Sequence, residues 1–346
     1  MVNVRVSGIV LSAFLAVATW TVHAATPFID TQAQFEIGVS TRNYVEISDA
    51  IVAEMDKWGV RMTLLVPPPQ PSQARFRQDI EDYLPVLKKH PGRFAALGGG
   101  GSINRMILES DPQRVGDGER RALRARVGEI LAAGAVGLGE VTSAHFSLPK
   151  MFQGHAYSAT APDHPLLLEL ADIAAERNVP IDIHFDVVPR DMPVPAHLAN
   201  ALNPAQLKAN LPQFERFVAH NRKASIVWSH AGSDPGRQRS VEMMQDLLAR
   251  HPNLYMSIRP NLTGPLPTVV LDSQGALKAE WRKLFLEFPD RFMMQTDAFY
   301  RLGTPIVQFG GVRAMEFGRA LLDQLPDEVA AKIGHANAQR LYRLGN

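Results

Sequence analysis

The sequence predicts an α/β protein built as a single (β/α)8 barrel, a TIM barrel, preceded by a signal peptide. Three observations support this fold class. Short apolar segments alternate with longer amphipathic segments, which is the pattern of parallel strands covered by helices on both faces. Eight such strand–helix units follow the first 25 residues. Three of the apolar segments end in an ionisable residue, at His184, His230 and Asp297, and the carboxyl ends of barrel strands carry the chemistry.

Composition narrows the classes of function. The chain has 346 residues, of which 46% are hydrophobic and 21% are charged, as in an ordinary globular protein. Its net charge of +1 gives no electrostatic reason to expect a nucleic-acid partner. The absence of cysteine excludes thiolate catalysis and thiolate zinc sites. We expect one domain over residues 26–346.

The amino terminus has the pattern of a secretory signal. Arg5 precedes an apolar run of 13 residues, GIVLSAFLAVATW at 8–20, and small residues follow at Ala24 and Ala25. The run is short for a membrane span, which needs about 20 residues. We expect residues 1–25 to be a signal peptide and the protein to be exported, periplasmic or secreted, with no stable membrane span after cleavage. A retained membrane anchor is the alternative.

The first four units are assigned from apolar runs and helical periodicity. The glycine run at 98–101 lacks the lysine and spacing of a P-loop, so a barrel loop is favoured over a phosphate site. A long irregular loop is expected at 141–162, and loops of this length often act as lids or binding loops. The expected strands are 28–30, 60–66, 94–97 and 135–139, and the expected helices are 43–58, one ending near 89, 118–133 and 165–177.

The last four units continue the alternation to the end of the chain. Two short helices at 327–333 and 336–342 are expected to close it. A doubly wound open sheet is the alternative, but no GxGxxG follows the first strand. The expected strands are 179–184, 225–229, 254–258 and 292–296, and the expected helices are 204–221, 237–250, 275–288 and 312–325.

Four strand ends supply candidate ligands for a metal. His184, His230 and Asp297 follow strands five, six and eight, and Glu140 follows strand four. Imidazole and carboxylate are suitable ligands for zinc, manganese or iron. Each residue alone has a structural alternative, such as a hydrogen-bonded histidine or an aspartate that caps the next helix. Their occurrence at four strand ends favours a shared site.

The sequence resembles the amidohydrolase superfamily, in particular its amidohydrolase-related metal-dependent hydrolases and decarboxylases, which are TIM barrels. The resemblance covers residues 27–344 and depends on the order and spacing of several short motifs. These motifs are FIDTQAQ at 28–34, GLGEV at 137–141, PIDIH at 180–184, IVWSHAG at 226–232, PNLYMSI at 252–258, MQTDAF at 294–299 and HANAQRLYRL at 335–344.

The resemblance implies roles for three residues. His184 would be a metal ligand. His230 would bind the metal or the substrate, or orient the attacking water. Asp297 would bind the metal and accept the proton of that water. This scheme is chemically coherent, because a divalent ion lowers the pKa of bound water to about 7 and a neighbouring carboxylate can take its proton.

The first strand departs from the family pattern. The family has two histidines where this chain has Gln32 and Gln34, although Asp30 keeps its place. A glutamine oxygen is a weaker zinc ligand than imidazole. Three interpretations remain open: a metal held by the other residues with the glutamines assisting, a harder ion such as manganese or magnesium, or loss of metal binding. The expected cofactor is a divalent metal, zinc in the first place, with manganese, magnesium, iron or no metal as alternatives.

The expected function is hydrolysis of an amide, ester or lactone bond in a small molecule. Arg259, after strand seven, is a candidate for binding a substrate carboxylate, with a salt bridge at the barrel rim as the alternative. Gln32 and Gln34 are candidates for substrate contact. Two alternatives remain: a metal-dependent decarboxylase, and a non-catalytic periplasmic binding protein on a decayed barrel. A homodimer is an open expectation. Weaker candidates for lining the entrance or contacting substrate are His145, His155, His164, Asp186 and Arg190.

Overall fold

The structure is a computed structural model of the chain, and it describes residues 26–36, 41–70, 77–148, 157–259, 266, 268–301, 303, 307–309 and 311–345. The expected signal peptide and His155 lie outside these ranges, as does part of the predicted loop at 141–162. Within the described part of the chain, no helix has both the length and the apolar character needed to cross a membrane.

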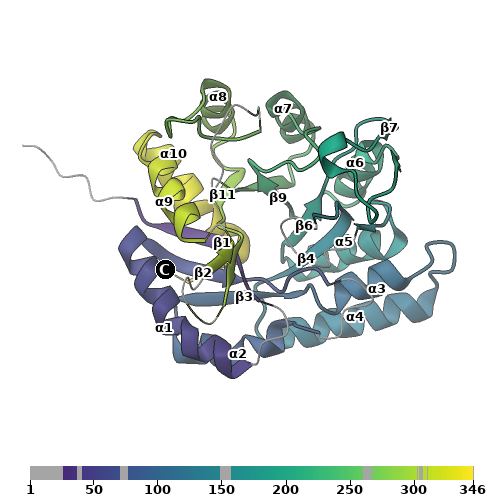
Figure 1. Cartoon of the computed structure of the whole chain (residues 1–346). Helices are drawn as coiled ribbons and strands as arrows, with labels where there is room; N and C mark the ends of the chain where they lie inside the picture. Colours follow the sequence, from purple (N-terminus) through teal and green to yellow (C-terminus); the bar gives the residue numbers. More distant parts are fainter. Residues whose placement is uncertain are drawn as a thin grey trace, which may run out of the picture.

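A large parallel sheet forms the centre of the molecule (Figure 1). Neighbouring strands pair in parallel from β1 round to β10 and β11. The strands of this sheet are β1 (Phe28–Phe35), β2 (Val60–Leu65), β3 (Phe94–Gly99), β4 (Gly137–His145), β6 (Ile181–Phe185), β9 (Ile226–Ala231), β10 (Leu254–Ile258), β11 (Phe292–Met294) and β12 (Ala298–Tyr300).

The sheet returns to its first strand through residues 292–300. β11 pairs with β10, and β12, three residues later, pairs with β1. Between them, the Gln295 N–H donates to the Ile258 carbonyl of β10 and the Asp297 N–H donates to the Gln32 carbonyl of β1, both at 2.9 Å. β11 and β12 therefore act as one interrupted eighth strand. The arrangement is the parallel α/β fold predicted from the sequence and is consistent with a (β/α)8 barrel.

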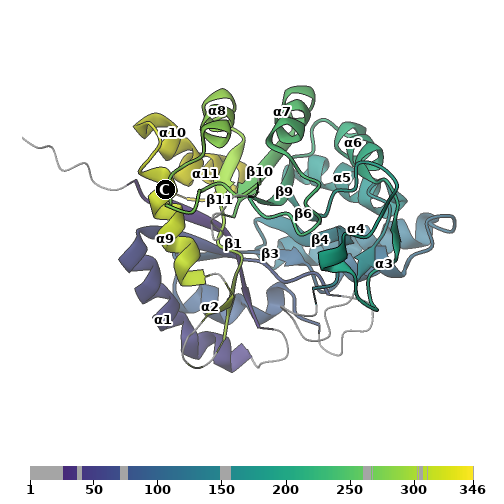
Figure 2. The same ribbon diagram turned by 45° about the horizontal axis from the view of Figure 1, so that its top comes forward.

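Helices lie around the outside of the sheet (Figure 2). Their buried faces, with the outward side chains of the strands, form the main hydrophobic core. The helices are α1 (Thr41–Trp58), α2 (Leu84–Lys89), α3 (Ile103–Glu109), α4 (Asp117–Ala132), α5 (Pro165–Arg177), α6 (Leu211–His220), α7 (Val241–Arg250), α8 (Ala279–Glu287), α9 (Gly311–Leu322), α10 (Asp327–Ala331) and α11 (Asn337–Tyr342).

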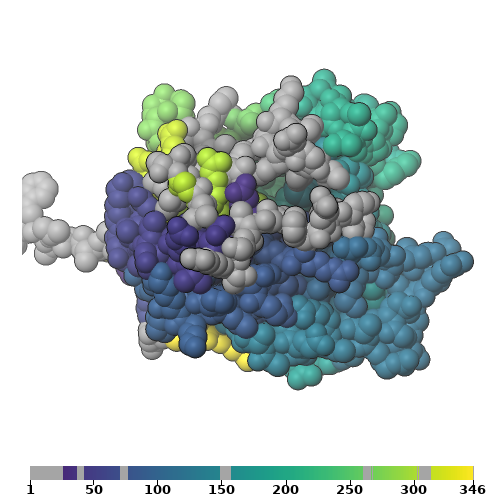
Figure 3. Space-filling model, turned by 60° about the horizontal axis from the view of Figure 1, so that its bottom comes forward, coloured from purple at the N-terminus to yellow at the C-terminus, as the bar shows by residue number. Residues whose placement is uncertain are grey.

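A second, inner core fills the end of the sheet where the strands begin. Ile29, Val227 and Met293 lie at the amino ends of β1, β9 and β11 and pack in one cluster with Leu341 and Tyr342 of α11. The carboxyl-terminal helix therefore covers this end. In the space-filling view of Figure 3, the purple and blue first part of the chain occupies the lower region of the visible face.

Most differences from the predicted elements are shifts of a few residues. One of the larger shifts concerns strand four, which runs on through His145 because Ala144 pairs with Phe185 of β6 and with Ala159 of β5 (Ser158–Ala159). Glu140 therefore lies inside a strand and not at its end. The helix expected at 204–221 begins only at Leu211, because residues before it form β8 (Gln206–Leu207) against β7 (Met192–Pro193). A further short strand is β13 (Val307–Phe309).

Candidate active site

Three buried side chains from neighbouring parallel strands meet at one place. Glu140 comes from β4, His184 from β6 and His230 from β9. His184 Nδ1 and His230 Nε2 lie 3.2 Å and 3.0 Å from the same oxygen, Glu140 Oε1. One ligand atom from each residue falls within 4.8 Å of the others. One carboxylate and two imidazoles form a donor set that fits a catalytic divalent ion and leaves room for water.

The backbone at two site residues is unusual for the residue types present. His230 has φ +65° and Asp297 has φ +50°. This left-handed region is uncommon outside glycine and concentrates at functional sites. Both residues follow apolar strand segments, and the reversal turns their side chains into the site.

Three glutamines surround the other side of the carboxylate. Gln32 Nε2 and Gln34 Nε2, from β1, donate to Glu140 Oε2 at 2.7 Å and 3.0 Å. Gln295, between β11 and β12, places its Nε2 3.0 Å from Gln32 Oε1 and 2.6 Å from His230 Nδ1. All three side chains are buried. The glutamines predicted as substrate contacts therefore lie in the site, hydrogen-bonded to the candidate metal ligand.

Asp297 lies next to the Glu140–His184–His230 group and is held by an arginine. Arg259 Nη1, from the end of β10, is 2.8 Å from Asp297 Oδ2. The same carboxylate lies 3.9 Å from His230 Nδ1 and 3.5 Å from Gln34 Nε2. Asp297 is thus close to the site but is not a member of the close ligand group.

The buried charges of the site support one another. Burial opposes ionisation of Glu140, but the neighbouring His230 and His184 outweigh it and lower the pKa of Glu140 to about 2. Burial likewise opposes the charged form of His184, but Asp186 and Glu140 raise the His184 pKa to about 10. His184 Nε2 lies 3.4 Å from Asp186 Oδ2. A carboxylate behind a ligating histidine fixes the orientation of its ring.

A second group of ligand type shares His184. His145, His184 and Asp186 also bring one ligand atom each within 4.8 Å, and the rings of His145 and His184 have centroids 3.9 Å apart. Of the weaker candidates, His145 and Asp186 therefore lie beside the site. His164 instead caps α5, since its Nδ1 accepts the Leu166 N–H, which is a structural role.

Two residues of the site were not predicted from the sequence. Gln295 lies two residues before Asp297 in the MQTDAF motif, and this proximity was its only signal. Arg239 lies seven residues after the IVWSHAG motif and nine residues after His230, and no sequence pattern marked it. Its guanidinium donates to the carbonyls of His230 at 2.8 Å and Phe185 at 3.2 Å and lies over the Trp228 ring.

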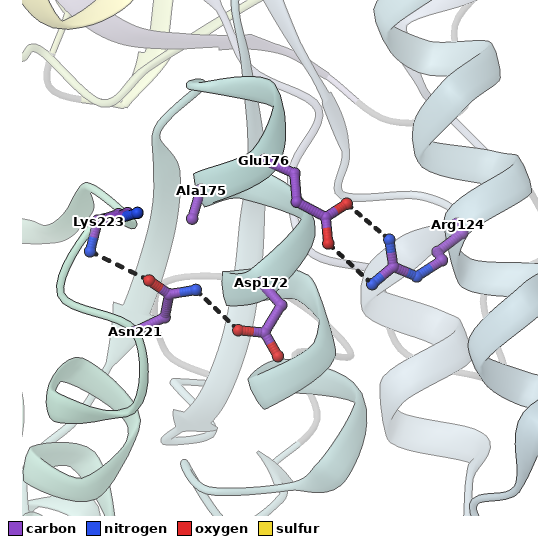
Figure 4. A pocket seen from close by; sticks show the side chains of 6 residues that line it. All are labelled: Arg124, Asp172, Ala175, Glu176, Asn221 and Lys223. Carbon is purple, nitrogen blue, oxygen red and sulfur yellow. Dashed lines mark hydrogen bonds and ion pairs between the residues drawn. The ribbon is translucent and has the colours of Figure 1, made fainter.

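A surface hollow between α4, α5 and the chain after α6 is separate from this site (Figure 4). Its arginine and its two carboxylates are already paired: Arg124 Nη1 donates to Glu176 Oε2 at 2.7 Å, and Asn221 Nδ2 donates to Asp172 Oδ1 at 2.8 Å. These pairs join neighbouring helices. The hollow thus has a structural explanation.

Comparison with protein families identifies one match. A family model described as amidohydrolase matches residues 69–344, most of the chain. The matched region contains Glu140, His184, His230, Arg259 and Asp297, whereas Gln32 and Gln34 precede it. No curated protein sequence matches this chain.

Solved structures share the fold at low sequence identity. A triple mutant of the organophosphorus hydrolase from Deinococcus radiodurans has a TM-score of 0.52 and 14% identity, with 92% of this chain and 94% of that chain covered. A structure described as amidohydrolase 2 from Bifidobacterium longum subsp. infantis has a TM-score of 0.48 and 14% identity, with 92% and 99% covered. The first of these likenesses supports a shared fold.

Proposed function

Because the chain belongs to the amidohydrolase family, we propose that it is a metal-dependent hydrolase that cleaves an amide, ester or lactone bond of a small molecule. The observation that carries the proposal is the convergence of Glu140, His184 and His230, whose ligand atoms lie within 4.8 Å of one another beside Asp297. These residue types, on neighbouring parallel strands, are suited to hold one divalent ion, with zinc as the first candidate.

In the proposed hydrolysis, some residues bind the metal ion and another transfers the proton. Glu140, His184 and His230 would hold the ion, which when bound would lower the pKa of water to about 7 and polarise the scissile carbonyl. Asp297 is the carboxylate placed to accept the proton of the attacking water and to return it to the leaving group. Arg259 positions this carboxylate through its 2.8 Å ion pair.

The test replaces the proposed proton acceptor. Asp297→Ala should lower kcat by a factor of about 10² to 10⁴ on any amide, ester or lactone that the wild-type protein hydrolyses, with an unchanged circular dichroism spectrum. Asp117→Ala removes an exposed carboxylate from the first turn of α4 and should leave kcat unchanged. Full activity of Asp297→Ala would remove Asp297 from the mechanism.

Arg259 favours a second candidate function, decarboxylation of a small carboxylic acid. Its Nε has no hydrogen-bond partner among the described residues, so the guanidinium retains capacity for an anion. A guanidinium binds a carboxylate through two parallel hydrogen bonds. Release of carbon dioxide from a carboxylic acid, with loss of that activity in Arg259→Met, would favour the lyase over the hydrolase.

Export is part of the proposal and depends on the composition of residues 1–25. Cell fractionation of the natural host, with mass spectrometry of the amino terminus, should find a chain that starts near residue 26 outside the cytoplasm. An uncleaved chain in the cytoplasm would contradict export without affecting the proposed chemistry.

A further inference from the structure

We propose that Gln32 and Gln34 restrict the site to a single divalent cation, held on the side of Glu140 that faces His184 and His230. The proposal builds on the proposed metal-dependent function and adds the number of ions and the residues that set it. It follows from the way in which the two oxygens of one buried carboxylate are used.

The two oxygens of the Glu140 carboxylate have different neighbours. Its Oε1 faces two imidazole nitrogens, at 3.2 Å and 3.0 Å, whose lone pairs can bind a cation once their protons leave. Its Oε2 faces the amide nitrogens of Gln32 and Gln34, at 2.7 Å and 3.0 Å. Imidazole supplies lone pairs, whereas an amide NH2 group supplies only protons. The two sides therefore differ in kind.

The orientation of the amides follows from elementary chemistry. An ionised carboxylate accepts hydrogen bonds and cannot donate them, so each glutamine must turn its nitrogen toward Glu140. Gln32 then turns its oxygen to Gln295, whose Nε2 donates to it at 3.0 Å. Gln295 is in turn oriented by its own oxygen, which accepts the His230 backbone N–H at 3.1 Å and the Ser257 hydroxyl.

A second cation beside Oε2 would meet unfavourable conditions. Gln34 Nε2 lies between the carboxylates, 3.0 Å from Glu140 Oε2 and 3.5 Å from Asp297 Oδ1, so its protons occupy the place where an ion could contact both. To admit the ion, both amides must turn, which breaks the bond between Gln32 and Gln295. The turned amides would then offer only neutral oxygens, which are weak ligands for zinc.

The experiment counts ions. Metal-free full-length protein is titrated with Co²⁺, followed by its visible absorption, and elemental analysis gives the bound metal per chain after loading with Zn²⁺. The wild-type protein should bind one equivalent. The double variant Gln32→His/Gln34→His, which replaces the protons on this side by imidazole lone pairs, should bind two. Gln34→Leu should still bind one, because the glutamine is not a ligand.

Each outcome decides a different point. Two equivalents in the wild type would overturn the inference and leave the proposed metal-dependent function intact. One equivalent in both the wild type and a double variant with a native circular dichroism spectrum would show that the glutamines do not set the number. If the double variant fails to fold, loss of the ion in Gln34→Leu would overturn the inference. No metal in the wild type would overturn the proposed function itself.

Discussion

At the scale of single residues, the site depends on how each buried polar atom is partnered. Glu140 accepts from four nitrogen groups, two imidazoles and two amides, so its charge is stabilised although it is buried. Gln32 and Gln34 therefore place hydrogen-bond donors against this carboxylate where the family has possible cation ligands. Gln34 Oε1 itself has no hydrogen-bond partner among the described residues.

Asp30 makes a contribution to stability that depends on pH. Burial raises its pKa from 3.8 to about 7, against the opposing effect of hydrogen bonds from Thr296. Because the folded pKa exceeds the unfolded one, the folded chain holds the proton longer as pH rises. The stabilisation that comes from this raised pKa is complete below pH 4 and is lost as pH rises to about 7. The loss lowers the free energy of unfolding by up to about 4 kcal/mol.

The Asp30→Asn variant tests this dependence. Denaturant titrations of both proteins between pH 4 and pH 8 should give a difference in unfolding free energy that shifts in favour of the variant as pH rises. The amide keeps the acceptor for the Thr296 N–H, which Asp30 Oδ1 accepts at 2.7 Å. A difference that stays constant over this range would contradict a raised pKa at Asp30.

At the scale of elements, the two glycines that follow β3, Gly100 and Gly101, are required by close packing. A Cβ added at Gly100 would lie 1.9 Å from the Pro67 carbonyl oxygen, and one at Gly101 would lie 2.2 Å from the Gln78 oxygen. The loops after β2 and β3 therefore touch through their backbones, as the barrel-loop interpretation implied. No side chain larger than a hydrogen fits there.

Two alanine substitutions separate close packing from helix propensity. Gly100→Ala should lower the free energy of unfolding by about 2 kcal/mol or more, because the methyl group overlaps a backbone oxygen. Gly128→Ala lies within α4 with nothing within 4 Å of the added Cβ and should raise it by about 0.5–1 kcal/mol. Urea titration measures both, and equal effects of the two substitutions would contradict the packing argument.

Arg239 joins the ends of the two strands that carry the histidines. It bonds to backbone carbonyls of β6 and β9, and burial lowers its pKa to about 10 while Asp234 and Asp186 oppose this shift. Arg239→Met should lower the unfolding free energy by about 3 kcal/mol, since two carboxylates lose their cation. It should also weaken metal affinity by about 10-fold to 100-fold.

The control for this variant is Arg237→Met in the same loop. Arg237 is exposed, so the variant has the same change in net charge without loss of a buried contact. Thermal unfolding and metal titration should show little change for Arg237→Met. Equal effects of the two substitutions would mean that charge, and not the bonds to β6 and β9, is responsible.

At the scale of the whole molecule, metal binding should be coupled to folding. The three candidate ligands come from strands far apart in sequence, so only the folded chain presents them together. Zinc at 100 times its dissociation constant should raise the unfolding free energy by about 2.7 kcal/mol, and a chelator should reverse this. His184→Ala should abolish the effect, measured as a melting temperature, whereas His197→Ala, at an exposed site, should retain it.

Much of this architecture was predictable because it is encoded locally. The buried strand β9 begins with the apolar run Ile226–Trp228, and a helix such as α5 is marked by Pro165 at its start and Asn178, with φ +51°, at its end. Their alternation fixes a parallel sheet, and a parallel sheet brings its carboxyl ends to one edge. Hence His184, His230 and Asp297 could be grouped because each follows an apolar segment, and Glu140 was added to them although it lies inside β4 and not at its end.

The sequence by itself determined the alternating α/β plan, the family and the chemical types at the strand ends. Only the tertiary structure decided which atoms meet: that Glu140 faces imidazoles on one side and glutamine amides on the other, that Arg259 holds Asp297, and that Gln295 and Arg239 belong to the site. The physical reason is the separation along the chain between the residues that interact. Strand and helix patterns arise between near neighbours, whereas hydrogen-bond partners separated by 90 residues (His230 and Glu140) or 263 residues (Gln295 and Gln32) are set by packing of the whole chain.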